Sequence, residues 1–268
     1  MPEGHTIHRL ATRHAELLGG DVVKAASPQG RFAAGAARLS GSKLVSTEAY
    51  GKHLLHHYDS GAILHVHLGL YGKFSDGVLP APDPIGQLRM RLWNERSWID
   101  LRGPTACELL DGPDLEALLT RLGEDPLRPD ADPDAAFARI HKREAPLTNL
   151  LLDQSIIAGA GLIFVMEVLY RAGLRPLTPG RKLRPKKWAG IWQDLTTLMA
   201  QAVVTGRIDT VRPQHMPEAM GRPPRVDRHG GEVYVYRRPG LPCLICNAPV
   251  QRGELNGRNT YWCAKCQS

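Results

Sequence analysis

Four cysteines near the C-terminus constrain the fold of this chain more than any other feature of its sequence. They form two pairs, Cys243/Cys246 and Cys263/Cys266, and 16 residues separate the pairs. This spacing is typical of a site in which four thiolates hold one zinc ion. Because four thiolates leave no open position for water, the zinc is expected to be structural and not catalytic. Redox-active or unrelated cysteines are the alternative.

The residues between the cysteine pairs fit a β-hairpin, with Asn256-Gly257 as its tight turn. Arg258 follows that turn, and a guanidinium on a metal-stiffened hairpin suits contact with a phosphate or a base edge. The simpler interpretation of Arg258 alone is a surface arginine.

Positive charge is concentrated in the same part of the chain. Residues 1–180 hold 19 Lys and Arg against 21 Asp and Glu, whereas residues 181–268 hold 15 against 6. The whole chain therefore has a net charge of +7 that comes from its last third. This distribution favours a face that binds a polyanion, and a solvated basic surface is the alternative.

Membrane and secretory classes are not indicated. The sequence has no run of about 18 apolar residues and no basic N-terminal flank followed by an apolar core. We therefore expect a cytoplasmic protein, a monomer without disulfides. The fifth cysteine, Cys107, is expected to be a buried small hydrophobic residue.

The sequence predicts an α+β protein with two main domains, as its 268 residues favour. A helix is expected over residues 5–18, and a capped helix begins at Asp111 and ends at Leu122. Between them, short apolar runs alternate with Gly, Asp and Pro turns, which is typical of an antiparallel β sandwich or barrel. These runs are residues 43–47, 53–58, 63–68, 90–92 and 98–101.

Helical periodicity dominates the second half. Residues 123–134 are rich in Pro and Asp and are predicted to be a linker. Helices are expected over residues 135–143, 147–154, 156–172 and 185–205, followed by an irregular loop over 206–225 and a short β unit. The predicted division is a β-sandwich domain at 1–122, the linker at 123–134, a helical domain at 135–225 and a zinc hairpin at 226–268.

The first residues can carry nucleophilic chemistry. If Met1 is removed, Pro2 becomes a secondary amine beside the carboxylate of Glu3. Such an amine can attack an aldehyde-like carbon and form an iminium ion. An α-amino group titrates near ~7.7–8.0, so a useful fraction is neutral at working pH. Taken alone, the tripeptide Pro2-Glu3-Gly4 is an ordinary start of a chain.

Three further places in the sequence suit contact with nucleic acid. Lys52 precedes an apolar strand and can reach a phosphate, or it is a solvated strand end. Leu70 and Tyr71 lie in a turn and are either core residues or wedges that fill the gap left by an extruded base. Gly161 lies at a helix start, where backbone N–H groups suit a phosphate, although glycine is common at helix joints.

Together these motifs resemble the formamidopyrimidine-DNA glycosylase/endonuclease VIII family of DNA repair enzymes over nearly the whole chain. The motifs are Pro2-Glu3-Gly4, Gly51-Lys52, Leu150-Leu151-Leu152-Asp153-Gln154-x4-Gly159-x-Gly161 and Gly257-Arg258-Asn259-Thr260-Tyr261-Trp262-Cys263. The resemblance implies a β sandwich flanked by helices, then a helix-two-turn-helix domain and a C-terminal zinc-finger hairpin. It implies damaged DNA, duplex or single-stranded, as the partner.

The resemblance also implies roles for single residues. Pro2 would attack C1′ of the damaged nucleotide, and Glu3 would act as general acid and base at the sugar. Lys52 and Arg258 would contact phosphates near the lesion, and the iminium intermediate would undergo β and δ elimination. Pro2-Glu3-Gly4 with Leu70-Tyr71 looks like the endonuclease VIII branch, similar to its actinobacterial members, which favours oxidised pyrimidines over 8-oxoguanine.

Three residues depart from the family pattern. Leu162 stands where the family has an asparagine that holds a DNA phosphate, Thr6 where many members have an acidic residue, and Gly69 where a glutamine completes the wedge. These departures suggest a weaker grip on duplex DNA and a preference for lesions in single-stranded or open DNA. Leu162 also keeps open the alternative of a weakly active or inactive zinc-finger DNA-binding protein on the same fold. A zinc-ribbon RNA-binding module is a further alternative that fits the cysteines and the charge but leaves Pro2-Glu3 and Lys52 unexplained.

Overall fold

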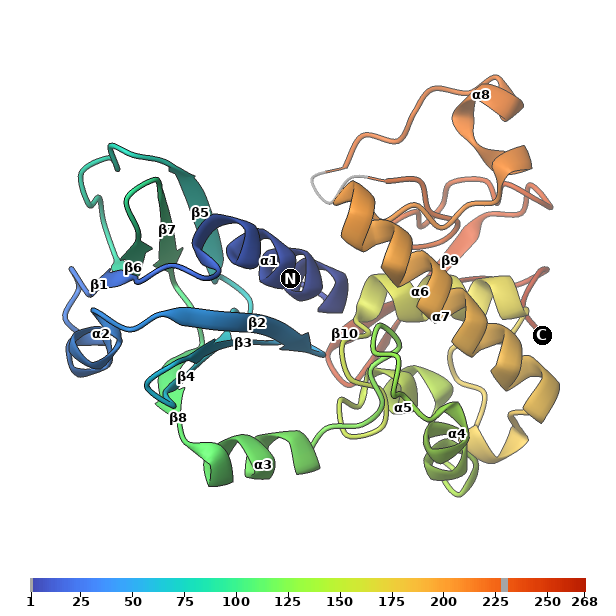
Figure 1. Cartoon of the computed structure of the whole chain (residues 1–268). Coiled ribbons are helices and arrows are strands. Elements are labelled where there is room, and N and C mark those ends of the chain that lie inside the picture. The colour runs from blue at the N-terminus through green and yellow to red at the C-terminus, as the bar shows by residue number, and fades with distance from the viewer. Residues whose placement is uncertain (1, 228–230) are drawn as a thin grey trace. The chain divides into compact units, whose positions relative to one another are not determined.

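The chain forms two compact units. The computed structural model describes residues 2–227 and 231–268. The units are Met1–Arg121, built mainly of strands, and Leu122–Ser268, built mainly of helices (Figure 1). This composition confirms the predicted α+β class. The predicted boundary between residues 225 and 226 stays a prediction.

Two four-stranded antiparallel sheets form the body of the first unit. Their strand orders are β2-β3-β4-β8 and β1-β6-β7-β5. The sheets share one hydrophobic core, to which Leu54 and Leu64 contribute from one sheet and Leu92 and Ile99 from the other. The predicted β sandwich is therefore confirmed. The strands are β1 Lys24–Ala26, β2 Leu44–Tyr50, β3 His53–Tyr58, β4 Ile63–His67, β5 Lys73–Val78, β6 Leu88–Trp93, β7 Ser97–Arg102 and β8 Ala106–Leu110.

Helix α1, Gly4–Leu18, runs over strands β2 and β3. Its buried positions Ile7, Ala11, His14 and Leu18 recur every three or four residues, so they form one face of the helix. This face holds α1 along its whole length, and it therefore fixes the first residues of the chain against the sandwich. The helix ends at the predicted place, before Gly19.

Two shorter helices complete the first unit, α2 at Ala33–Leu39 and α3 at Gly112–Thr120. Asp111 caps α3 by accepting a hydrogen bond from Asp114 N at 2.9 Å. The Asp114 side chain in turn accepts from Asp111 N, which completes a capping box. Helix α3 thus starts where its sequence predicts.

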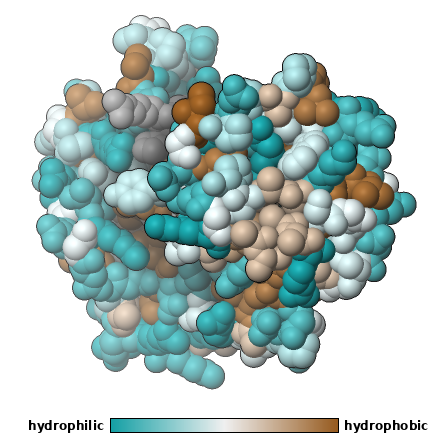
Figure 2. Space-filling model, turned by 90° about the vertical axis from the view of Figure 1, so that its left-hand side faces the viewer, coloured by the Kyte–Doolittle hydropathy of each residue, from teal (hydrophilic) through white to brown (hydrophobic). Residues whose placement is uncertain are grey.

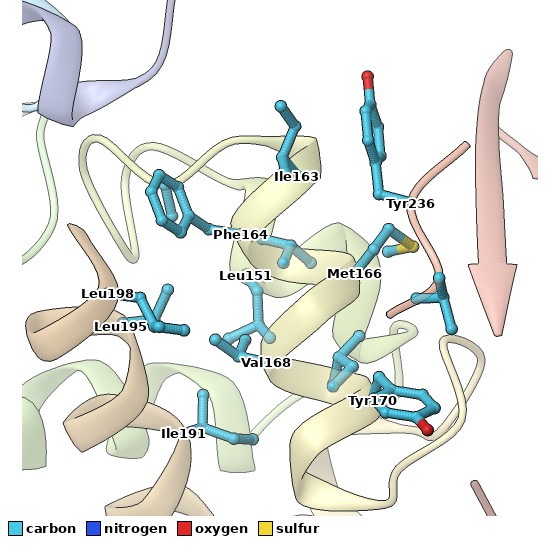
Figure 3. Packing of buried hydrophobic residues seen from close by; sticks show 14 of the residues in the cluster. Leu151, Ile163, Phe164, Met166, Val168, Tyr170, Ile191, Leu195, Leu198 and Tyr236 are labelled. Atoms are coloured by element: carbon cyan, nitrogen blue, oxygen red, sulfur yellow. The ribbon is translucent and has the colours of Figure 1, made fainter. Parts of the chain in front are cut away.

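The second unit packs its helices around α6, Leu162–Ala172. Every residue from Ile163 to Tyr170 is buried, and Val168 and Phe164 face the α7 residues Ile191, Leu195 and Leu198 (Figure 3). The other elements are α4 Pro133–His141, α5 Leu147–Leu152, η1 Gly180–Lys182, α7 Pro185–Thr205, η2 Pro213–His215, α8 Pro217–Met220, β9 Val250–Leu255 and β10 Arg258–Cys263.

Several predicted helix boundaries and one predicted loop differ from the structure. The helix predicted over 135–143 is α4, Pro133–His141, and the helix predicted to end at Leu122 ends at Thr120. Residues 156–161 are not helical, and α6 begins at Leu162, because Gly159 has a φ of +92° that a right-handed helix does not allow. The helix predicted to end at 154 ends at Leu152. The predicted loop over 206–225 contains the short helices η2 and α8.

The segment predicted as a linker, residues 123–134, packs within the second unit. Gly123 N donates to Gln154 O at 2.8 Å, and Glu124 forms a parallel bridge with Ile157. Asp125 is buried, and the first residues of α4 fall inside the same segment. Proline and aspartate serve here as turn and cap residues, since Asp132 caps α4.

A buried carboxylate ties two parts of the second unit together. Glu167 on α6 is fully buried and accepts hydrogen bonds from the backbone N–H groups of Tyr234, Val235 and Tyr236 at 2.7–2.9 Å. It also accepts from Thr210 Oγ1 at 2.6 Å. A buried carboxylate is tolerated when it is satisfied in this way, so Glu167 fixes the chain just before the zinc hairpin.

The exterior is mixed in polarity. The face shown in Figure 2 carries separate hydrophobic patches among hydrophilic residues. Within residues 2–227 and 231–268, none of the helices combines the length and the apolar character that crossing a membrane requires.

A buried histidine pair predicts acid sensitivity of the first unit. His14 Nδ1 and His56 Nε2 lie 3.0 Å apart, and both residues are buried. Burial lowers the pKa of His14 from 6.5 to about 3, with a smaller contribution from Arg13, and burial also lowers the pKa of His56. At a pH between about 3 and 6.5, His14 binds a proton in the unfolded chain but not in the folded one, so a fall in pH through this range favours the unfolded state.

Lowering the pH from 7.5 to 5 is expected to cost the first unit about 2 kcal/mol of stability for His14 alone. The unfolded chain binds the proton in this window and the folded chain does not, so stability falls as the pH falls. Hydrogen exchange of the α1 and β3 amides, corrected for intrinsic exchange, measures this loss. A variant with His14→Leu and His56→Leu should lose less stability over the same pH change. If the stability of that variant depends on pH as strongly as that of the unaltered protein, the account is contradicted.

Candidate functional site

The start of α1 places the candidate nucleophile. Glu3 is the N-cap residue of α1, with extended backbone, and it is 3% exposed. Its carbonyl accepts from Thr6 N at 2.9 Å, which begins the helix. Pro2 is half-buried directly before it. The packing of α1 thus holds both residues against the sandwich and does not leave them as a free end.

Pro2 and Lys52 line the same small cavity of about 20 Å³, together with His67. The remaining lining residues are Ile7, Leu68 and Gly69. Lys52 reaches this place from the two-residue turn between β2 and β3, in which Tyr50 pairs with His53. Gly51 has a φ of +57°, as the first central residue of such a turn requires. The structure therefore brings two sequence-predicted residues together with an apolar floor.

His67 is a residue of this cavity that sequence reasoning missed. No histidine of the chain is assigned a function from the sequence alone. His67 ends β4 and lies directly opposite His53 on β3. The alternation His65-Val66-His67 before Gly69 was the available signal, since it puts both imidazoles on one face of a strand.

Leu70 and Tyr71 are exposed at the tip of a tight turn. Their side chains are 58% and 82% exposed, so neither is a core residue. The turn is closed by Gly72 N donating to Leu68 O at 2.9 Å. Gly69 has a φ of +66°, and a Cβ there would lie 1.8 Å from Thr105 Oγ1. A side chain at position 69 would have to displace the Thr105 hydroxyl and adopt a left-handed backbone, so glycine suits this turn.

In the second unit, Gln154 shapes the turn between α5 and α6. Its Oε1 accepts from Gly159 N at 3.0 Å, and its Nε2 donates to Leu152 O and Ala160 O at 3.1 Å each. Helix α6 then begins after Gly161, its N-cap, and no side chain caps it there. The positive end of the α6 dipole therefore lies at Gly161, as the sequence-based expectation of a phosphate contact requires.

The four cysteines converge at the end of the zinc hairpin. Their Sγ atoms all lie within 4.8 Å of one another. Cys243 and Cys266 approach to 3.8 Å, and Cys246 and Cys263 to 3.4 Å. The Tyr170 hydroxyl on α6 lies 3.0 Å from Cys243 Sγ, so it supports this thiolate from outside the ligand set. Four sulfurs at this separation fit tetrahedral zinc.

Strands β9 and β10 project the candidate DNA contact Arg258. Asn256 and Gly257 have φ values of +51° and +72°, so both central residues of the turn are left-handed, as predicted for Asn-Gly. Arg258 is exposed directly after this turn. Nearby, Arg252 Nε donates to Asn259 Oδ1 at 3.0 Å, which ties the two strands together by their side chains.

Three family models match consecutive parts of the chain. Residues 1–107 match the formamidopyrimidine-DNA glycosylase N-terminal domain, and residues 122–213 match the formamidopyrimidine-DNA glycosylase H2TH domain. Residues 240–268 match the zinc finger found in FPG and IleRS. The chain belongs to the formamidopyrimidine-DNA glycosylase family. The match of the last segment, with the convergence of its four sulfurs, confirms the predicted structural zinc.

Two named members of the glycosylase family resemble this chain over all or most of its length. "Endonuclease 8 1" of Mycobacterium tuberculosis is 44% identical over 275 residues and covers 100% of both chains. The formamidopyrimidine-DNA glycosylase of Thermus thermophilus is 32% identical over 237 residues, which cover 86% of this chain and 85% of that protein. The resemblance to actinobacterial endonuclease VIII is thereby confirmed.

Solved structures of the glycosylase family share the fold. The MutM (Fpg) protein of Thermus thermophilus superposes with a TM-score of 0.76 at 30% identity, covering 99% of this chain and 98% of that chain. A Lactococcus lactis Fpg mutant in complex with Fapy-dG containing DNA gives a TM-score of 0.81 at 20% identity, with both chains covered completely. At 20% identity, the resemblance to the Lactococcus lactis protein shows a shared fold only.

Replacing Tyr170 by Phe is expected to weaken zinc binding about tenfold, because the thiolate of Cys243 loses its hydrogen-bond donor. Competition with a chromogenic chelator measures the affinity. Tyr261→Phe is the matched control, since Tyr261 is also buried in this unit and its hydroxyl has no hydrogen-bond partner within the described ranges. Equal zinc affinities of the two variants would contradict the supporting role of Tyr170.

Proposed function

We propose that this protein is a DNA glycosylase of base excision repair that also cleaves the strand as an abasic-site lyase. The observation that carries the proposal is the shared cavity of Pro2 and Lys52 at the start of α1, with Glu3 buried next to it. A packed helix start presents an amine and a carboxylate in one fixed geometry, as nucleophilic catalysis requires. Membership in the glycosylase family supports the same assignment.

The chemistry follows from the Pro2 amine once Met1 is removed. The nitrogen attacks C1′, the bond from C1′ to the base breaks, and the base leaves with a proton. The attached nitrogen loses its proton, and protonation of O4′ by Glu3 breaks the bond from C1′ to O4′, which opens the sugar ring and leaves an iminium ion. The iminium ion acidifies C2′, so that loss of a C2′ proton expels the 3′-phosphate and a second elimination expels the 5′-phosphate. Glu3 supplies and removes protons at the sugar, and Lys52 neutralises the adjacent phosphate.

DNA contacts are assigned to both units. In the first unit Leu70 and Tyr71 act as wedges that fill the space of the flipped nucleotide, which their exposure on a tight turn supports. In the second unit Arg258 and the α6 start at Gly161 bind phosphates. The excess of basic residues over 181–268 supplies the favourable long-range field.

Oxidised pyrimidines in damaged DNA are the proposed substrates. Endonuclease 8 relatives match the chain over its full length, and the exposed Leu70-Tyr71 pair fits that branch. We propose that the protein acts as a monomer in the cytoplasm.

A second candidate function rests on Leu162. It lies at the first position of α6, where the family's asparagine would hold a phosphate, and leucine cannot donate that hydrogen bond. A protein that binds lesions through its zinc hairpin and cleaves weakly or not at all fits this substitution. Rates of cleavage on duplex and single-stranded DNA distinguish the two functions.

Glu3→Gln is expected to lower base excision by about 10²–10⁴-fold, because the amide keeps the shape of the side chain and cannot transfer protons. Oligonucleotides that contain an oxidised pyrimidine, resolved by gel after cleavage, provide the rate. Cys107→Ala is the control, since Cys107 packs beside the sandwich core away from this cavity. Full activity of Glu3→Gln would remove Glu3 from the mechanism.

Leu162→Asn is expected to strengthen binding to lesion-containing duplex DNA by about tenfold, which corresponds to one hydrogen bond to a charged group. Binding to the same strand without its complement should change less. Leu177→Asn, at an exposed position of the same unit, controls for added polarity. If Leu162→Asn leaves the duplex affinity unchanged, the phosphate does not lie at α6.

A further inference from the structure

The outer face of the β2-β3-β4-β8 sheet carries three histidines to which the proposed reaction assigns no role, although one of them, His67, also lines the cavity of Pro2 and Lys52. Alternation along the strands points Leu54, Leu64 and Val66 into the core, so His53, His65 and His67 lie on the opposite face. Helix α3 covers part of this face through a small apolar cluster of Leu55, Ile63 and Leu118 with Leu110 and Leu115. His53, His65 and His67 are not part of that cluster and line the cavity next to it.

An open cavity of about 580 Å³ lies over the three imidazoles. Its wall also includes Glu108 of β8 and Asp114, Leu118 and Arg121 from the α3 region. The cavity belongs wholly to the first unit. Three imidazoles at an open cavity form a different chemical environment from the buried His14–His56 pair.

A chain of hydrogen bonds fixes how two of these imidazoles present their nitrogens. Glu108 Oε1 lies 2.9 Å from His65 Nδ1, and His65 Nε2 lies 2.9 Å from His53 Nδ1. A carboxylate only accepts, so His65 Nδ1 is the donor and its Nε2 is the acceptor. His53 Nδ1 must then donate, which leaves His53 Nε2 with a free lone pair in the neutral ring.

His67 supplies a second imidazole beside the first. It lies directly opposite His53 across the two strands, with ring centroids 4.9 Å apart. Within the described part of the chain, neither ring nitrogen of His67 has a hydrogen-bond partner. Residues directly opposite on antiparallel strands have Cβ atoms about 4.5–5.5 Å apart, so their side chains can converge on one ion.

We propose that His53 and His67 form a second metal site, which binds a late first-row divalent ion such as Ni²⁺, Cu²⁺ or Zn²⁺ with water in the remaining positions. Imidazole suits these ions, whereas Mg²⁺ and Ca²⁺ prefer several oxygen ligands. Glu108 and His65 are positioning residues, because their hydrogen bonds fix the tautomer and ring orientation of His53.

This site differs from the zinc site of the hairpin. Within the described residues, the four cysteines are the group of three or more potential ligands that converge within 4.8 Å. The proposed histidine site has only two protein ligands, so its metal ion would be open to water and exchangeable. The histidine site binds metal more weakly than the four thiolates do, so added metal fills the cysteine site first.

Titration calorimetry of tag-free, zinc-loaded protein with NiCl₂ tests the proposal without DNA. We expect one Ni²⁺ per chain in addition to the hairpin zinc, with binding weakened at least about tenfold by His53→Gln and by His67→Gln. Glu108→Gln should weaken binding about tenfold while the zinc content stays at one per chain. His57→Gln is the matched control, because His57 lies on the same face of β3 and bonds to Glu48 at 2.9 Å.

No additional Ni²⁺ in the unaltered protein overturns the proposal, as does equal binding by the His53→Gln and His57→Gln variants. Loss of binding in His57→Gln alone would place the ion elsewhere on the strand. Should a variant fail to fold, the unaltered protein decides: Ni²⁺ must broaden the imidazole NMR signals of His53 and His67 before those of His57. The reverse order of broadening contradicts the site.

Discussion

The packing of helix α1 on the sandwich is the constraint on which the proposed activity depends. Ile7, Ala11, His14 and Leu18 anchor the helix, and this anchoring extends to Glu3 at its N-cap and to Pro2 before it. A chain terminus is ordinarily mobile unless it is tied down. We propose that the burial of one face of α1 orders the amine that Pro2 gains once Met1 is removed, so that catalysis begins without a separate ordering cost.

The second unit achieves rigidity by other means. Burial around α6 supplies the core, the carboxylate of Glu167 ties that helix to residues 234–236, and Tyr170 reaches from it to the zinc thiolate of Cys243. The body of one helix therefore packs against the metal hairpin, and we propose that the start of the same helix at Gly161 binds DNA. This arrangement keeps the turn that carries Arg258 stiff although the hairpin has little core of its own.

Sequence reasoning succeeded where local chemistry decides structure. The cysteine spacing, the Asn256-Gly257 turn and the Asp111 cap each determine their own geometry. It missed β5, whose sequence contains Asp76 and Gly77, because an edge strand with one neighbour needs no apolar alternation. It also missed the pairing of His53 with His67, since cross-strand register depends on the tertiary fold and not on either segment alone.

The central claim is that the amine of Pro2 becomes covalently attached to deoxyribose during the reaction. Borohydride reduction of protein mixed with abasic-site DNA, followed by nuclease digestion and peptide mass spectrometry, locates that attachment. The account predicts a sugar adduct on the N-terminal peptide, at Pro2, in protein that has lost Met1. An adduct on Lys52 or another lysine with Pro2 unmodified, or no adduct at all, would contradict it.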